Sequence, residues 1–107
     1  MVSYFQNKKA GPEILPFSFP TEVEEGQLLQ VSCVVTKGDE PITLQWYKDS
    51  TPLVSSNKFM VNNVDSTLSM LILRGVAAKH SGTYSCVAYN TVGRATVTAK
   101  LNVKGNN

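Results

Sequence analysis

Two cysteines and a single histidine are the side chains of this sequence best suited to metal binding, redox or nucleophilic chemistry. Cys33 and Cys86 do not form a Cys-x-x-Cys pair, and His80 is the only imidazole. A structural zinc ion takes four such ligands, and a redox dithiol usually has its two cysteines close together in the chain. The set therefore favours a buried disulfide over a metal or redox site, and we expect no metal and no cofactor.

Catalytic groups are also sparse. A nucleophile needs a base beside it and a third group that orients the base, but the His80-Ser81 pair has no identifiable third member. The carboxylates of Glu22, Glu24 and Glu25 are expected to cluster at an exposed, solvated edge. A catalytic acid and base would instead be held together in a cleft. The sequence contains neither a Gly-rich phosphate loop nor an EF-hand calcium loop, so we expect no enzyme.

Length and composition place the chain among small globular domains. Its 107 residues suffice for one hydrophobic core and are too few for two. Hydrophobic residues make up 42%, charged residues 17%, and the net charge is +2, which favours neither disorder nor a nucleic-acid partner. No stretch approaches the roughly 20 apolar residues of a membrane span, and the first residues lack the apolar core of a signal peptide.

Short runs of β-forming residues separated by turn residues predict an all-β domain. Pro16 and Pro20 interrupt the first run, which favours an edge strand that passes from one sheet to the other. Lys37–Pro41 and Asp49–Pro52 are predicted turns. The expected strands are Glu13–Phe19, Thr21–Glu24, Gln27–Thr36, Ile42–Lys48, Phe59–Asn63, Thr67–Arg74, Thr83–Asn90 and Gly93–Val103.

The order of Cys33, Trp46, Tyr84 and Cys86 narrows the all-β class to one architecture. It matches the immunoglobulin layout, in which an inter-sheet disulfide packs against a tryptophan and a tyrosine lies two residues before the second cysteine. We therefore expect an immunoglobulin-like β-sandwich, with two antiparallel sheets and Greek-key connections. The expected disulfide is Cys33–Cys86, the expected core includes Trp46, Leu71, Leu73 and Tyr84, and an oxidising, extracellular compartment follows from the disulfide.

Several motifs resemble those of intermediate-type (I-set) immunoglobulin domains over nearly all of residues 11–103. They are Trp46-Tyr47-Lys48-Asp49, Leu71-Ile72-Leu73 followed by Val76, Ser81 to Cys86, and Asn90-Thr91-Val92-Gly93. The segments Ile14–Phe19, Gly38–Ile42 and Trp46–Pro52 resemble a narrower group, the Dscam-type cell-adhesion proteins of arthropods. The similarity is to their alternatively spliced domains, including those of the shortened chelicerate forms. It implies self-recognition at the cell surface by a larger, membrane-anchored protein.

We expect three parts along the chain. Residues 1–10 are a disordered leader or residues added for expression, residues 11–104 are a single I-set domain, and residues 105–107 are a linker stub. A membrane anchor of the parent protein would lie outside this sequence.

One position departs from the I-set pattern. The motif before the second cysteine commonly begins with an aspartate that pairs with a basic residue, whereas this chain has His80 there and Lys58 as the would-be partner. That ion pair is not expected, and its loss should matter little because surface pairs contribute about 0–1 kcal/mol. We expect His80 to be an ordinary turn residue, with a pH switch as the alternative. The resemblance also implies that the Tyr84 hydroxyl bonds to the backbone near this corner.

Strand alternation predicts which side chains face outward. With Cys33 inward, Leu29, Val31 and Val35 also point inward, and with Leu71 and Leu73 inward the residues between them point out. A register error of one residue would reverse this assignment. The predicted outer A-B-E-D face is unexpectedly apolar, whereas the opposite sheet is mostly polar outside. The expected interface residues are Leu28, Gln30, Val34, Met60, Leu68, Met70, Ile72 and Arg74.

Exposed apolar patches of this kind usually mark an interaction site, and no Asn-x-Ser/Thr glycan acceptor shields either face. We therefore expect weak homophilic pairing of two antiparallel copies about a two-fold axis, with Lys37, Lys58 and Arg74 at the rim. Tandem domains would raise the affinity. Two alternatives stay open. The domain could bind another ligand or a pathogen, through its loops or through the sheet face that carries Tyr47 and Tyr89. It could also be a structural spacer inside the cell, where its two cysteines would stay reduced.

Overall fold

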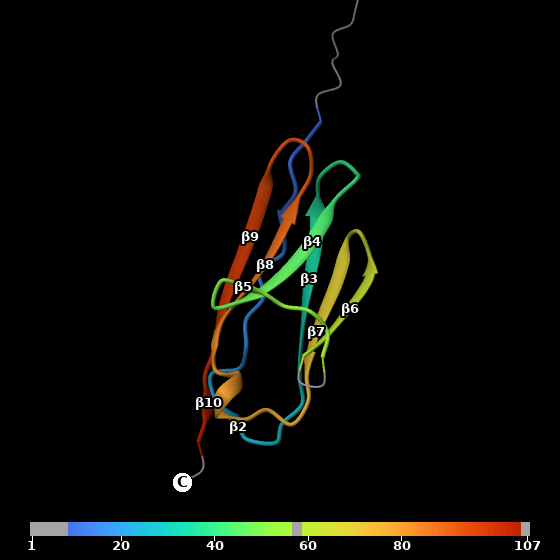
Figure 1. Ribbon diagram of the computed structural model, residues 1–107. Coiled ribbons are helices and arrows are strands. Elements are labelled where there is room, and N and C mark those ends of the chain that lie inside the picture. Colours follow the sequence, from blue (N-terminus) through green and yellow to red (C-terminus); the bar gives the residue numbers. More distant parts are fainter. Residues whose placement is uncertain (1–8, 57–58, 106–107) are drawn as a thin grey trace, which may run out of the picture.

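Two four-stranded antiparallel sheets face each other in the computed structural model, which describes residues 9–56 and 59–105 (Figure 1). The first sheet has the order β1–β3–β7–β6, and the second has the order β5–β4–β8–β9. This arrangement confirms the predicted all-β sandwich. The strands are β1 (Glu13–Ile14), β3 (Leu29–Lys37), β7 (Leu68–Leu73), β6 (Met60–Asp65), β5 (Thr51–Pro52), β4 (Thr43–Lys48), β8 (Gly82–Tyr89) and β9 (Arg94–Leu101).

The N-terminal strand divides between two partners, as the prolines predict. β1 pairs antiparallel with β3, whereas β2 (Val23–Glu24) pairs parallel with β10 (Val103–Lys104), the short strand that follows β9. The predicted length of the first strand is wrong. Only two residues of Glu13–Phe19 form a strand, because Pro16 ends the run of amide hydrogens that a ladder needs.

The predicted turn over Asp49–Pro52 is wrong in its second half. Asp49 and Ser50 form the turn with positive φ angles of 49° and 71°, as the tight hairpin turn that matches strand twist requires. Thr51 and Pro52 then form β5, which pairs with the end of β4. Proline is tolerated there because β5 is the edge strand of its sheet. The strand expected over Phe59–Asn63 also begins one residue later and extends to Asp65.

The core lies between the sheets and contains the predicted residues. Cys33 on β3 and Cys86 on β8 form a disulfide with a Cα–Cα distance of 6.2 Å. Trp46 is 1% exposed, and Leu71, Leu73 and Tyr84 are fully buried. Two aromatic residues from the segment between β1 and β2 complete the core, with Phe17 against the Trp46 ring and Phe19 against the Tyr84 ring.

A polar chain crosses this core and was not predicted. The indole N–H of Trp46 donates to the Ser69 hydroxyl oxygen at 2.9 Å, and Ser69 donates to the Asn63 side-chain oxygen at 2.7 Å. Ser69 is fully buried. Its hydroxyl supplies the acceptor that a buried indole needs, so a polar residue occupies an inward position of β7.

The corner before β8 holds a short 3₁₀ helix, η1 (Ala78–His80). The Tyr84 hydroxyl donates to the His80 carbonyl, as the family resemblance implies. The expectation of an ordinary turn histidine is wrong, because the His80 side chain is only 3% exposed and its Nδ1 accepts the Ala77 N–H at 2.8 Å. Lys58, the would-be partner, lies outside the described residues, as do residues 1–8 of the expected leader.

Candidate interaction surface

The register of the first sheet decides which side chains face outward. On β3 the buried residues are Leu29, Val31 and Cys33, whereas Val35, also predicted inward, is half-buried near the strand end. On β7 the buried residues are Ser69, Leu71 and Leu73. The alternating residues Leu68, Met70 and Ile72 therefore point outward, in the register that the sequence predicts.

The residues predicted for the interface occupy neighbouring positions on this outer side, and we call the eight together the outer patch. Its members are Leu28, Gln30, Val34, Met60, Leu68, Met70, Ile72 and Arg74. Three rows cross β3, β7 and β6, namely Gln30–Ile72–Met60, Ser32–Met70–Asn62 and Val34–Leu68–Asp65. Leu28 immediately precedes β3, and Arg74 immediately follows β7.

Exposure varies across the outer patch. Leu28 and Met60 are 48% and 43% exposed, and Gln30 and Arg74 are also exposed. The other four members are half-buried. Alternation alone would leave them in solvent, but side chains on adjacent strands cover one another within a sheet. The centre of the patch is thus an apolar line of Leu68, Met70 and Ile72 along β7, with limited exposure of each residue, and polar Ser32 and Asn62 flank Met70.

Leu15 extends the patch on the β1 side and was missed by the sequence analysis. It is 54% exposed, and its N–H donates to the Val34 carbonyl at 2.9 Å. Ile14 packs on the core, so Leu15 points to the opposite side. Strand alternation from Ile14 could have identified it, but Pro16 obscures the pattern.

Opposite charges lie at the two ends of this face. Arg74 is exposed at the end of β7, and Asp65 is exposed opposite Leu68, at the start of the same strand. Hydrogen bonds from the side chain and the backbone of Thr67 lower the pKa of Asp65, so its carboxylate is ionised at neutral pH. Glu13 and Lys37 are register partners at the end of the face that contains Asp65, and their opposite charges cancel. The face therefore has a cationic end and an anionic end.

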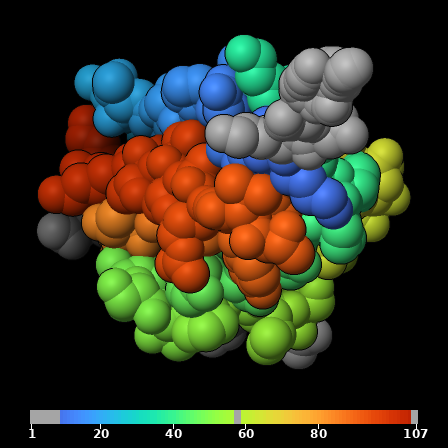
Figure 2. Space-filling view, turned by 90° about the horizontal axis from the view of Figure 1, so that it is seen from above, coloured from blue at the N-terminus to red at the C-terminus, as the bar shows by residue number. Residues whose placement is uncertain are grey.

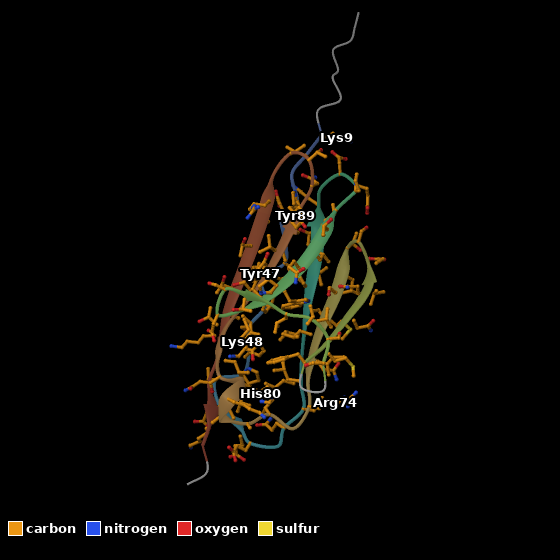
Figure 3. All side chains as sticks on the ribbon, in the orientation of Figure 1. Lys9, Tyr47, Lys48, Arg74, His80 and Tyr89 are labelled. Atoms are coloured by element: carbon orange, nitrogen blue, oxygen red, sulfur yellow. A yellow bond between two sulfur atoms is a disulfide. The ribbon has the colours of Figure 1, made fainter. Side chains whose placement is uncertain are left out.

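The outer side of the second sheet is more polar, as predicted. Figure 3 shows Tyr47 and Tyr89 on this sheet, while Arg74 lies at the lower end of the other sheet. Tyr47 is half-buried and Tyr89 is 41% exposed. The hydroxyls of Ser85 and Thr98 lie 3.1 Å apart across β8 and β9. A second surface with two aromatic residues in polar surroundings is thus available.

One end of the sandwich is tied together by Asn90. Its side-chain amide donates to the carbonyls of Ala10 and Asp39 at 2.8 and 3.0 Å. The Ala10 N–H also donates to the Asp39 carboxylate at 2.6 Å. Figure 2 accordingly shows the orange β8–β9 hairpin beside the blue start of the described chain. Ala10, assigned to the leader from the sequence, makes specific contacts with the domain.

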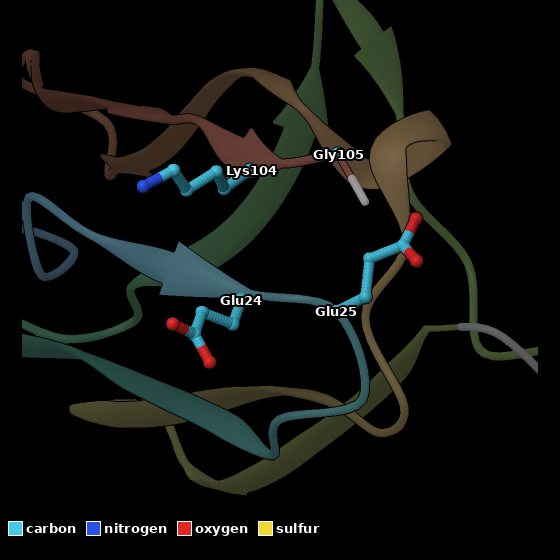
Figure 4. A pocket seen from close by; sticks show the side chains of 4 residues that line it. All are labelled: Glu24, Glu25, Lys104 and Gly105. Carbon is cyan, nitrogen blue, oxygen red and sulfur yellow. The ribbon is translucent and has the colours of Figure 1, made fainter. Parts of the chain in front are cut away.

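Among the residues considered for other chemistry, His80 and Ser81 make structural contacts, and the Glu24 and Glu25 carboxylates do not form a pair. Figure 4 shows the carboxylates of Glu24 and Glu25 turned away from each other, in a pocket completed by Lys104 and Gly105. The Ser81 hydroxyl accepts the Val103 N–H at 2.9 Å, and His80 Nδ1 accepts a backbone N–H. No group of three or more His, Cys, Asp or Glu residues suited to a metal occurs in residues 9–56 and 59–105. None of the helices in these ranges is long and apolar enough to span a bilayer.

Comparison with known proteins gives one consistent family. The immunoglobulin I-set domain description matches residues 12–103. The cell adhesion molecule Dscam2 of Drosophila melanogaster is 39% identical over 93 residues, which cover 87% of this chain and 4% of that protein. The cell adhesion molecule DSCAM of Rattus norvegicus is 40% identical over 82 residues, covering 77% of this chain and 4% of the relative. The chain thus spans a small part of these relatives.

Solved structures give the same result. The crystal structure of the Dscam1 Ig7 domain, isoform 5, has a TM-score of 0.85 and 33% identity, covering 88% of this chain and 97% of that one. The titin domains Z1Z2 in complex with telethonin have a TM-score of 0.81 and 31% identity, covering 94% of this chain and 50% of theirs. Both an adhesion-protein domain and a domain of titin are therefore close in structure.

Proposed function

The chain belongs to the immunoglobulin I-set family, and from this we propose that it is an extracellular recognition module that pairs weakly with a second copy of itself through the outer patch. The similar proteins named as cell adhesion molecules support an adhesion-type module. The disulfide supports an oxidising compartment, and a larger, membrane-anchored parent at the cell surface accords with the much longer relatives.

The observation that carries the proposal is the charge arrangement around the apolar centre. Consider a two-fold axis that lies in the contact plane, runs across the strands and passes through the row that contains Met70. With this axis, each end of the face of one copy lies against the opposite end of the face of the other copy. Arg74 of one copy then faces the Leu68 and Asp65 end of the other, and this contact occurs twice because the interface is isologous. A two-fold axis parallel to the strands would instead bring Arg74 of one copy close to Arg74 of the other copy, so that like charges meet. The charges therefore favour antiparallel copies.

The size of the face predicts a low affinity. From Leu68 to Arg74 the strand extends about 20 Å, at roughly 3.4 Å per residue. Four strands spaced about 4.8 Å apart are about 19 Å wide, which gives a flat area of about 400 Å² per copy. Standard stable interfaces bury about 800 Å² per partner. A single domain would therefore associate weakly, and tandem domains and many molecules per cell contact would supply the avidity.

Sedimentation of the isolated domain over a concentration range tests the proposal. The wild-type domain is expected to show a reversible dimer, and Met70→Asp and Ile72→Asp are expected to abolish it, because each places a charge in the apolar centre. Thr98→Asp is the matched control, because Thr98 is exposed on the outer side of the second sheet. A wild type that remains monomeric to high micromolar concentration, or a Thr98→Asp variant as impaired as the other two, would contradict the proposal.

A charge exchange tests the antiparallel geometry. Arg74→Asp and Asp65→Arg should each weaken self-association, since each variant meets a like charge in its twin. A mixture of the two variants should form a heterodimer, because both contacts then join opposite charges. If the mixture associates no better than either variant alone, the proposed axis is wrong even if the face is right.

The similarity to titin domains supports a second candidate function, a structural spacer in a tandem array. A spacer would show no self-association, and in a reducing compartment its two cysteines would be free thiols. The variant Tyr47→Ala distinguishes self-association from binding of another ligand through Tyr47 and Tyr89. It would impair ligand binding, whereas dimer formation through the outer patch would persist. Mass spectrometry of the natural protein with and without reductant distinguishes the two compartments.

A further inference from the structure

We propose that His80 makes the corner around η1 sensitive to acid, so that its protonation loosens η1 and the start of β6. The imidazole is 3% exposed and lies at the lower end of the sandwich (Figure 3). The Phe59 ring contacts it edge-on at a centroid distance of 5.5 Å, and Tyr84 packs behind Phe59 at 6.5 Å. A buried titratable ring therefore packs against Phe59, which in turn contacts Tyr84 on β8.

The hydrogen bond to Nδ1 determines which protonation state fits. The Ala77 N–H lies 2.8 Å from Nδ1, so this nitrogen must carry a lone pair. In the imidazolium ion both ring nitrogens carry hydrogens, and Nδ1 would then direct its hydrogen at the hydrogen of Ala77. Protonation thus removes the acceptor of a backbone N–H at the start of η1 and places a charge in a buried position against the Phe59 ring. Both effects disfavour the protonated form.

Two cations on neighbouring elements act in the same direction. Lys79 on η1 and Lys104 on β10, which packs against η1, are cations that would repel an imidazolium. Glu24 on β2 is the register partner of Lys104. Burial raises the pKa of the Tyr84 hydroxyl, so that group stays neutral and donates to the His80 carbonyl. Asp49, the carboxylate that interacts with Tyr84, accepts the Thr83 N–H and pairs with Lys48.

Phe59 connects this corner to the outer patch. It contacts His80 and immediately precedes Met60, the first residue of β6. When His80 is protonated and its contacts with Phe59 change, the first residues of β6 lose one side of their packing. Since β6 is the edge strand of its sheet, its start would then be held by β7 on one side and by the hydrogen bonds that join Phe59 and Val61 to Ser56 and Ser55. Weaker self-association at acid pH is a consequence that rests on the proposed function, whereas the loosening of the corner does not.

A proton NMR titration of the imidazole tests the proposal directly, because this chain has a single histidine. At concentrations where the domain is monomeric, the pKa of folded His80 should lie below the ordinary value of about 6.5. Amide hydrogen exchange at about pH 5 and about pH 7, corrected for the intrinsic pH dependence of exchange, should show loss of protection at the start of β6 and none in β9. A pKa at or above 6.5, or unchanged protection in β6, would overturn the proposal.

The variant His80→Asn separates titration from structure, because its amide oxygen can accept the Ala77 N–H and does not titrate. The folded pKa of His80 lies below the unfolded pKa, so wild-type stability is complete above about pH 6.5 and falls with pH below it. The unfolding equilibrium constant of the wild type should rise up to tenfold per pH unit relative to His80→Asn. Equal pH dependence of the two proteins would contradict the proposal, and if His80→Asn does not fold, the NMR titration decides alone.

Discussion

The buried polar chain from Trp46 to Asn63 gives the sharpest stability prediction. Replacing Ser69 by alanine removes the acceptor of the indole N–H, which lies 2.9 Å away, at a position where the side chain is fully buried. An unsatisfied buried donor costs about 1–3 kcal/mol. For a domain of this size, 1 kcal/mol corresponds to a fall in Tm of roughly 4 °C or more.

Urea unfolding followed by the fluorescence of Trp46 is the appropriate assay, because the chain has one tryptophan and the variant changes its immediate surroundings. The matched control is Asn63→Ala. Asn63 is exposed, so water can replace it as the acceptor for Ser69, and the expected cost is below about 1 kcal/mol. The reasoning is refuted if Ser69→Ala lies within about 0.5 kcal/mol of the wild type, or if Asn63→Ala is the more destabilising of the two.

Two other predictions concern the disulfide and the turn between β4 and β5. Reduction of Cys33–Cys86, which are 53 residues apart, should lower the free energy of unfolding by about 4 kcal/mol, measured as a fall in Tm with a thiol reductant; an unchanged Tm would contradict it. Hydrogen bonds from the Thr83 backbone and from Lys48 lower the pKa of Asp49, so this exposed carboxylate stabilises the fold above about pH 4 and loses that effect as the pH falls. Between about pH 4 and about pH 2 the urea midpoint of the wild type should therefore fall more steeply than that of Asp49→Asn, and parallel curves would show that the contact contributes nothing.

The sequence predicted the architecture well because a few residues constrain it strongly. A disulfide between Cys33 and Cys86 requires their strands to face one another across two sheets, and the structure confirms this placement, with Trp46 buried as the register partner of Cys86. The outward direction of Leu68, Met70 and Ile72 was also predictable, because Leu71 and Leu73 define the buried side of a strand with a period of two.

The missed features depend on contacts between residues distant in the chain. Ser69 occupies a buried position because Trp46, on the other sheet, needs an acceptor. His80 is buried because Phe59 and the Tyr84 corner enclose it, although its sequence neighbours Lys79 and Ser81 are typical of a turn. Leu15, which lies beside the outer patch, follows the same rule, because its position is set by pairing with Val34 rather than by its neighbour Pro16.

By itself, the amino-acid sequence determined the fold class, the disulfide, the core and the direction of side chains along each strand. These follow from local periodicity and from cysteine and aromatic positions, and each strand carries that information within itself. Only the tertiary structure decided which strands lie side by side, and hence that Gln30, Ile72 and Met60 form one row while Arg74 and Asp65 lie at opposite ends of one face. Neighbours across a sheet are set by pairing between distant segments, so the shape and charge of a surface emerge only when the strands are assembled.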